Sequence, residues 1–248
     1  MELIIRQDPP QTGDRLMAED SSLLEQAERG QIGPVLRFYE WIEPTISLGF
    51  HQSLDTLDHA RLAEDKQAWT RRPTGGAAVM HSQELTYAII MPYDETAAGA
   101  ALIQELVSRS LVEGLRGVGV QAEMSARGEP LTALQNRASC FVRTSRWEVT
   151  VRGRKIVGSA QRKRDHAILQ HGSILIGNDH LRITDYLKME SDEARQILKD
   201  RLDEKATCIE NETQNSVNMD VLRECMAAGF MRIFSASNIL KQSMVGAK

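Results

Sequence analysis

The residues best suited to chemistry fall into two blocks of the chain, with a cysteine between them. Residues 71–87 read RRPTGGAAVMHSQELTY and include the adjacent Gly75 and Gly76. Residues 155–176 bring further glycines, amide side chains and His171. Adjacent glycines allow positive φ angles and carry no Cβ, so the backbone can approach a ligand closely. A single Gly-Gly pair is most often an ordinary hairpin turn, but the second block favours a binding site.

Cys140 lies between the two blocks in the polar stretch NRASCFVRTSR. A free cysteine is often a small buried apolar residue, and these polar neighbours fit that interpretation poorly. A cysteine attacks as its thiolate, which a nearby cation stabilises. Lys155 is a candidate for that cation, and the alternative is a solvent-exposed lysine in a hairpin turn. Cys208 and Cys225 fall in expected helices and are assigned no chemical role.

Composition narrows the class of protein. The chain has 248 residues, 42% of them hydrophobic and 26% charged, with a net charge of −4. These values are ordinary for a globular protein and do not indicate a nucleic-acid partner. The three cysteines form no CxxC pair, so we predict no metal site. With no signal-peptide core and no bilayer-length apolar run, we expect a cytoplasmic protein without a membrane partner.

The hydrophobic pattern predicts short strands at 2–6, 35–41, 45–48, 69–72, 85–91, 120–124, 146–152, 155–161 and 167–176. Helices are expected at 14–30, 55–66, 100–115, from 191 onward and at 219–234. In the first helix Asp20 shares the apolar stripe with leucines. Together these elements predict an α+β fold, with a mixed or antiparallel sheet flanked by helices. We expect residues 1–248 to form a single catalytic domain, mainly helical at about 191–248. GxGxxG and GxxxxGK[ST] motifs are absent.

The two blocks resemble those of the lipoate/octanoate transferase and ligase family, which shares its fold with biotin protein ligases. RRPTGGAAVMH is similar to the family's RRxTGGGAVxH, and ELTYAI to its ELTYSV. RFYEWIEPTISLGFHQ and GRKIVGSAQRKRDHAILQHGSILI resemble two further family blocks. Ala77 departs from the pattern, because the family usually has a third glycine there. The resemblance implies substrate contacts from Arg72, Gly75, Gly76, His81, Gly158, Ser159, Ala160, His171 and Gly172. His81 and His171 remain open to the alternative of hydrogen-bonded core histidines.

The family divides by how the acyl group is activated. Its ligases form an acyl-adenylate from ATP, whereas its transferases take octanoyl from acyl carrier protein through a cysteine thioester. Common octanoyltransferases have that cysteine three residues before the HG pair, where this chain has Ile168. Another branch, known from Gram-positive bacteria, has a CF motif ahead of KxxGSAQ, as Cys140 and Phe141 stand here. The resemblance also makes Lys155 the family's active-site lysine.

The resemblance therefore implies an octanoyltransferase with Cys140 and Lys155 as catalytic residues and no cofactor. Octanoyl would pass from acyl carrier protein to a lysine of a lipoyl domain or glycine-cleavage H protein. Three alternatives stay open: an ATP- and Mg-dependent lipoate-protein ligase, a lipoyl or octanoyl amidotransferase, and a non-catalytic lipoyl-binding relative. Residues 141–164 contain eight Lys and Arg residues and a single acidic residue, Glu148. Such an excess of positive charge suits an acidic protein partner, and the alternative is a solvated basic hairpin.

Overall fold

The computed structural model describes residues 2–92, 99–125 and 147–237. Its centre is a five-stranded sheet in the order β1 (Ile4–Gln7), β2 (Val35–Tyr39), β6 (Glu84–Pro92), β11 (Ala167–Leu175), β10 (Val157–Lys163). Strands β1 and β2 run parallel, and the other neighbours are antiparallel. Strand β6 is central and almost wholly buried, as its continuous apolar run predicts.

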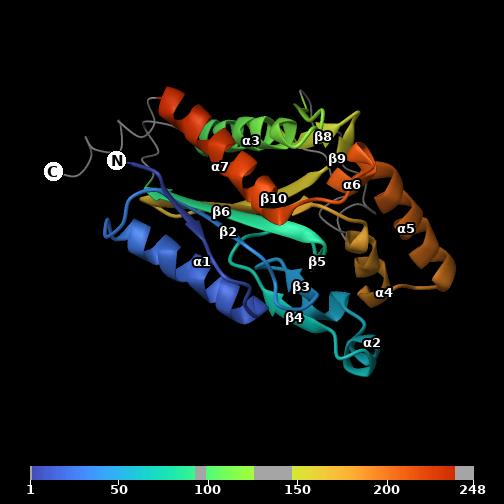
Figure 1. Ribbon diagram of the computed structural model, residues 1–248. Helices are drawn as coiled ribbons and strands as arrows, with labels where there is room; N and C mark the ends of the chain where they lie inside the picture. Colours follow the sequence, from blue (N-terminus) through green and yellow to red (C-terminus); the bar gives the residue numbers. More distant parts are fainter. Residues whose placement is uncertain (1, 93–98, 126–146, 238–248) are drawn as a thin grey trace.

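Helices cover both faces of this sheet (Figure 1). Successive side chains of a strand point to opposite faces, so Ala88 and Ile90 pack with helix α1 (Gly13–Glu28). Tyr87 and Ile89 join the larger core on the other face, under α3 (Ala100–Gly117) and α7 (Met219–Ala236). Each of the three helices packs against the sheet through its apolar stripe.

Two smaller sheets complete the fold. One has the order β4 (Ala68–Arg71), β3 (Thr45–Leu48), β5 (Val79–His81), and the other β7 (Glu123–Met124), β8 (Val149–Val151), β9 (Arg154–Lys155). Helices α2 (His59–Glu64), α4 (Ile183–Tyr186) and α5 (Asp192–Lys205) pack around the former, with 3-10 turns η1 (Leu54–Thr56) and η4 (Asp179–Arg182). Helix α6 (Ile209–Thr213) contributes Ile209 to the larger core. The structure confirms the α+β class.

Two expected elements are interrupted in the structure, and one strand was not expected. The helix expected at 55–66 is divided into η1 and α2, because Asp58 accepts backbone N–H bonds and starts a new helix there. The strand expected at 155–161 breaks at Ile156, so that Lys155 and Gly158 belong to different sheets. Strand β5 has three residues and was not predicted.

Candidate acyl-binding pocket

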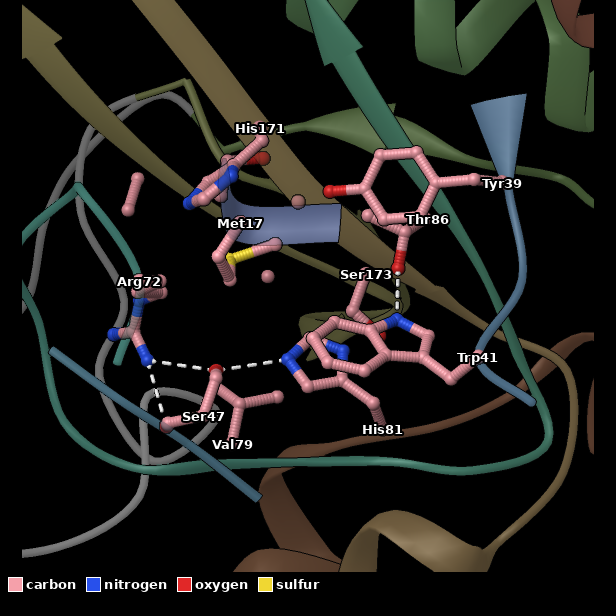
Figure 2. A pocket seen from close by; sticks show the side chains of 14 residues that line it. Met17, Tyr39, Trp41, Ser47, Arg72, Val79, His81, Thr86, His171 and Ser173 are labelled. Carbon is pink, nitrogen blue, oxygen red and sulfur yellow. Dashed lines mark hydrogen bonds between the residues drawn. The ribbon is translucent and has the colours of Figure 1, made fainter. Parts of the chain in front are cut away.

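The two glycine-rich blocks meet at a pocket of about 380 Å³ between the central sheet and the sheet of β3, β4 and β5 (Figure 2). Four strands of the two blocks contribute lining residues: β5 and β6 from the first block, and β10 and β11 from the second. Strands β10 and β11 pair antiparallel, and β5 leads into β6. The lining residues are Met17, Tyr39, Trp41, Ser47, Arg72, Val79, His81, Thr86, Gly158, Ser159, Ala160, His171, Gly172 and Ser173.

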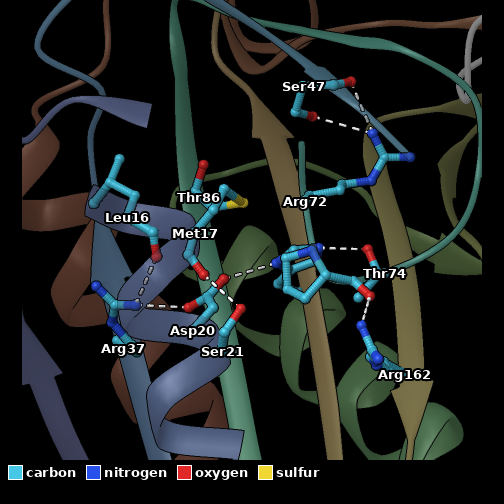
Figure 3. A network of polar contacts seen from close by, with 12 residues as sticks. Leu16, Met17, Asp20, Ser21, Arg37, Ser47, Arg72, Thr74, Thr86 and Arg162 are labelled. Atoms are coloured by element: carbon cyan, nitrogen blue, oxygen red, sulfur yellow. Dashed lines mark hydrogen bonds and ion pairs between the residues drawn. The ribbon is translucent and has the colours of Figure 1, made fainter. Parts of the chain in front are cut away.

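A buried carboxylate anchors one wall of the pocket (Figure 3). Asp20 Oδ2 lies 2.8 Å from His171 Nδ1 and accepts a hydrogen bond from the Tyr39 hydroxyl at 3.0 Å. Its other oxygen pairs with Arg37 Nη1 at 2.6 Å. On the far side of the imidazole, His171 Nε2 lies 2.6 Å from Thr74 Oγ1. This chain of contacts joins α1 through β11 to the Gly75–Gly76 loop.

His81 forms the opposite wall. Its ring stacks on Trp41 with centroids 3.9 Å apart, and its two nitrogens contact Glu84 Oε1 at 3.2 Å and Ser47 Oγ at 2.8 Å. Burial lowers the pKa of His81, and the Glu84 carboxylate only partly offsets this. The imidazole is therefore neutral near pH 7. Trp41 and His81 also line a neighbouring pocket of about 780 Å³, so their stacked rings lie between the two pockets.

Arg72 lines the pocket but uses its guanidinium to hold the chain around it. Nη2 donates to the carbonyls of Gly75 and Ala77 at 2.9 and 2.8 Å. Nη1 donates to the carbonyl and hydroxyl of Ser47 at 2.9 and 3.1 Å. Gly75 and Gly76 themselves are not among the lining residues, and the glycine loop instead contacts the lining residues Arg72 and His171 through Gly75 and Thr74.

Close backbone packing explains the glycine of the second block. A Cβ on Gly172 would lie 2.4 Å from the Gly158 carbonyl oxygen and 2.8 Å from the Tyr87 ring. The Tyr87 hydroxyl is 2.7 Å from Ser159 Oγ, and burial raises the pKa of Tyr87 to about 12, so the phenol stays protonated. Only glycine fits at 172 without moving the strand pair that lines the pocket.

Seven of the nine predicted substrate contacts thus line one pocket, the exceptions being Gly75 and Gly76. Sequence reasoning did not select Asp20, Tyr39, Trp41, Ser47 or Thr74. Asp20 carried a signal, because a carboxylate on an apolar helix stripe needs a buried partner. The others became recognisable only through tertiary contacts.

Lys155 does not lie in a solvent-exposed turn. It is 4% exposed, and its Nζ donates to Glu148 Oε1 at 2.8 Å across the β8–β9 hairpin. Lys155 is outside the set of pocket-lining residues, and Cys140 falls outside the described residues. The joint catalytic role of Cys140 and Lys155 stays a prediction from the family resemblance.

The family described as "Lipoyl protein ligase A/B catalytic domain" matches residues 14–231 of the chain. The chain belongs to this family. Among its relatives are proteins named Octanoyltransferase LipM from Carboxydothermus hydrogenoformans and Clostridioides difficile. The former is 34% identical over 92% of this chain and 85% of the relative. The latter is 33% identical over 88% and 82%, respectively.

The fold of this chain is similar to that of solved lipoate protein ligases. A bipartite lipoate protein ligase from Thermoplasma acidophilum aligns with a TM-score of 0.73 at 20% identity, over 95% of this chain and 84% of that one. A lipoate-protein ligase A bound with ATP aligns with a TM-score of 0.69 at 21% identity, over 94% and 85%. The predicted family and fold are both confirmed.

Within this lipoyl ligase family fold, Ile168 is fully buried in the main core cluster. Cys208 is buried, and burial raises the pKa of its thiol. It immediately precedes helix α6 rather than lying within a helix as expected, whereas Cys225 lies on α7 beside Gly117. None of these three residues lines the pocket.

In the described residues 147–164, the basic stretch does not form one solvated surface. Arg152 and Arg154 both pair with Glu212, and Lys155 is buried against Glu148. Arg164 lies 3.9 Å from Glu25. Between residues 2 and 237, gaps excepted, no helix is long and apolar enough to cross a membrane.

Proposed function

We propose that this protein transfers an octanoyl group, through a thioester on Cys140, to a specific lysine of a lipoyl domain or glycine-cleavage H protein. The observation that carries the proposal is the 33–34% identity, over most of the chain, to proteins named Octanoyltransferase LipM. Acyl carrier protein is the proposed donor, and no nucleotide or metal takes part.

The cysteines support this assignment. A thioester route needs a thiol that forms a thiolate and reaches the acyl group. Cys208 is buried with a raised thiol pKa, and Cys225 packs against α3. Neither lines the pocket. Cys140 is the remaining thiol in the sequence.

In the proposed reaction the Cys140 thiolate attacks the donor's thioester carbonyl. The carrier thiolate leaves and takes up a proton, which gives an acyl-cysteine. The neutral amine of the acceptor lysine then attacks this thioester, forms the amide and releases the Cys140 thiolate, while the amine loses its proton. The Lys155 ammonium stabilises the thiolate in both half-reactions.

The test is transfer from octanoyl carrier protein to an acceptor domain in ATP-free buffer containing a chelator. Product under these conditions supports the proposal. Product that forms only from free octanoate or lipoate with Mg-ATP identifies an ATP-dependent ligase instead. Transfer from an octanoylated or lipoylated protein, but not from the carrier, identifies an amidotransferase.

A further inference from the structure

An exposed aromatic residue lies at the outer side of the glycine loop. Phe50 follows strand β3 and is 43% exposed, and the Arg162 guanidinium sits 4.4 Å from the centre of its ring. Arg71, exposed on the edge strand β4, approaches the Phe50 carbonyl at 3.2 Å with its Nη1. An aromatic side chain beside arginines has the composition typical of binding hot spots.

This group is held rigidly. Arg71 Nη1 also lies 2.7 Å from the carbonyl oxygens of Gly49 and Gln52, which fixes the loop that carries Phe50. The Phe50 N–H donates to the Thr74 carbonyl at 2.8 Å. A Cβ on Gly49 would lie 1.9 Å from the Gly76 carbonyl oxygen, so the two loops are in direct backbone contact. A rigid surface loses little conformational entropy when a partner binds.

The same contacts connect this surface to the pocket. Arg162 Nη1 donates to the Pro73 carbonyl at 2.9 Å (Figure 3). The next residue, Thr74, binds Phe50 through its carbonyl and His171 through its hydroxyl. His171 lines the pocket. One residue therefore separates the exposed surface from the pocket wall.

The charge of the surface indicates its partner. Within the described ranges, the hydrogen bonds of Arg71 and Arg162 go to backbone carbonyls, and neither guanidinium has a carboxylate at ion-pair distance. Uncompensated guanidinium groups bind carboxylates and phosphates through paired N–H donors. An acyl carrier presents both, because its surface is acidic and its thiol arm is attached through a phosphodiester. An acceptor domain presents no such phosphate.

We propose that Phe50, Arg71 and Arg162 form the docking surface for the acidic carrier protein that delivers the acyl thioester. This inference rests on the proposed transferase function. It goes further by assigning the donor, rather than the acceptor, to a surface outside the pocket. Trp69 lies two residues before Arg71 on the same exposed face of β4 and extends the apolar part of that surface.

The test compares two donors that carry the same acyl group. The double variant Phe50→Ala/Arg162→Gln is assayed for acyl-enzyme formation with octanoyl carrier protein and with octanoyl-pantetheine, which lacks the protein. We expect kcat/KM to fall roughly ten- to thirtyfold with the carrier, as for loss of a hot spot, and by a clearly smaller factor with octanoyl-pantetheine, because Arg162 also holds the Pro73 carbonyl beside the pocket. The salt dependence of the carrier reaction should also weaken. Ile197→Ala/Arg201→Gln on α5 is the matched control, since both positions are exposed.

Equal losses with both donors would overturn the proposal, because the surface would then only support the pocket. No loss with the carrier, or a loss confined to acceptor binding or to binding of a single-stranded oligonucleotide, would also overturn it. If the unaltered protein forms no acyl-enzyme with either donor, the proposed function fails. Titration of the unacylated carrier against the unaltered and variant proteins then still decides the docking proposal: weaker binding by the variant supports it, and equal or absent binding refutes it.

Discussion

Asp20 Oδ2 and His171 Nδ1 lie 2.8 Å apart in the wall of the pocket, and the same carboxylate pairs with Arg37 at 2.6 Å. Asp20 and Arg37 are both fully buried. Asp20→Asn should lower the free energy of unfolding by roughly 3 kcal/mol, because the buried Arg37 charge would lose one of the two carboxylates it pairs with and keep Asp8. Denaturant unfolding measures this. Glu25→Gln, which removes exposed pairs only, should change stability by less than about 1 kcal/mol, and equal effects of the two changes would contradict the buried pairing.

The Thr74 hydroxyl connects His171 to the glycine loop. Thr74→Val keeps the side-chain shape and removes the contact at 2.6 Å, so the loop and imidazole lose their mutual orientation. We expect kcat with octanoyl-pantetheine to fall about tenfold, the effect of losing roughly 1.4 kcal/mol of a buried hydrogen bond. Thr74→Ser retains the hydroxyl and should recover most of the activity. If valine and serine variants behave alike, the hydroxyl does not position the wall.

His180 should control the stability of the fold at acidic pH. Burial lowers its pKa from 6.5 to about 4, although a backbone hydrogen bond with Gly177 and the charges of Asp203 and Asp179 act in the opposite direction. The unfolded chain therefore binds this proton more readily, so stability is lost as pH falls from about 6.5 toward 4. The contribution is about 3 kcal/mol by pH 4. His180→Gln should flatten the pH dependence of denaturant unfolding relative to the exposed-site variant His59→Gln, and parallel pH curves would refute this role.

Glu148 accepts a hydrogen bond from the Lys155 ammonium. Both residues should therefore affect the pH at which Cys140 becomes reactive. If Lys155 stabilises the thiolate, Lys155→Ala should move the pH profile of Cys140 alkylation upward. Each pH unit corresponds to about 1.4 kcal/mol of lost thiolate stabilisation. Glu148→Gln should move the profile downward, because it removes the carboxylate that lies 2.8 Å from Nζ. Unchanged profiles in both variants would assign thiolate stabilisation to another group.

Patterns of apolar residues were enough to predict most of the fold. The hydrophobic pattern predicted the central strand at 85–91 and the helix at 100–115, which the structure has as β6 and α3. Strand β5 was missed because three residues show no periodicity, and its strand character comes from pairing with β3. The break at Ile156 was missed because the adjacent apolar residues Ile156 and Val157, both buried, resemble the interior of one continuous strand, whereas the chain changes sheets there.

The pocket was predictable through its motifs but not through its geometry. Motif resemblance selected His81, His171 and Gly172, which the structure brings to one pocket. Arg72 was expected to contact the substrate, yet its described bonds hold Ser47, Gly75 and Ala77. The burial of Lys155 depends on a cross-strand partner, Glu148, whose position only the hairpin register determines. Such partners arise from tertiary pairing and leave no local sequence signal.

The most direct test of the account is the mass of the protein after incubation with octanoyl carrier protein alone. We expect one octanoyl addition, mapped to Cys140 by peptide analysis and removed by hydroxylamine, because a thioester is cleaved under conditions that leave an amide intact. Cys140→Ala should carry no such addition, while Cys208→Ala and Cys225→Ala should be acylated like the unaltered protein. An octanoyl thioester mapped to Cys208 or Cys225, or transfer that continues in Cys140→Ala, would contradict the central claim.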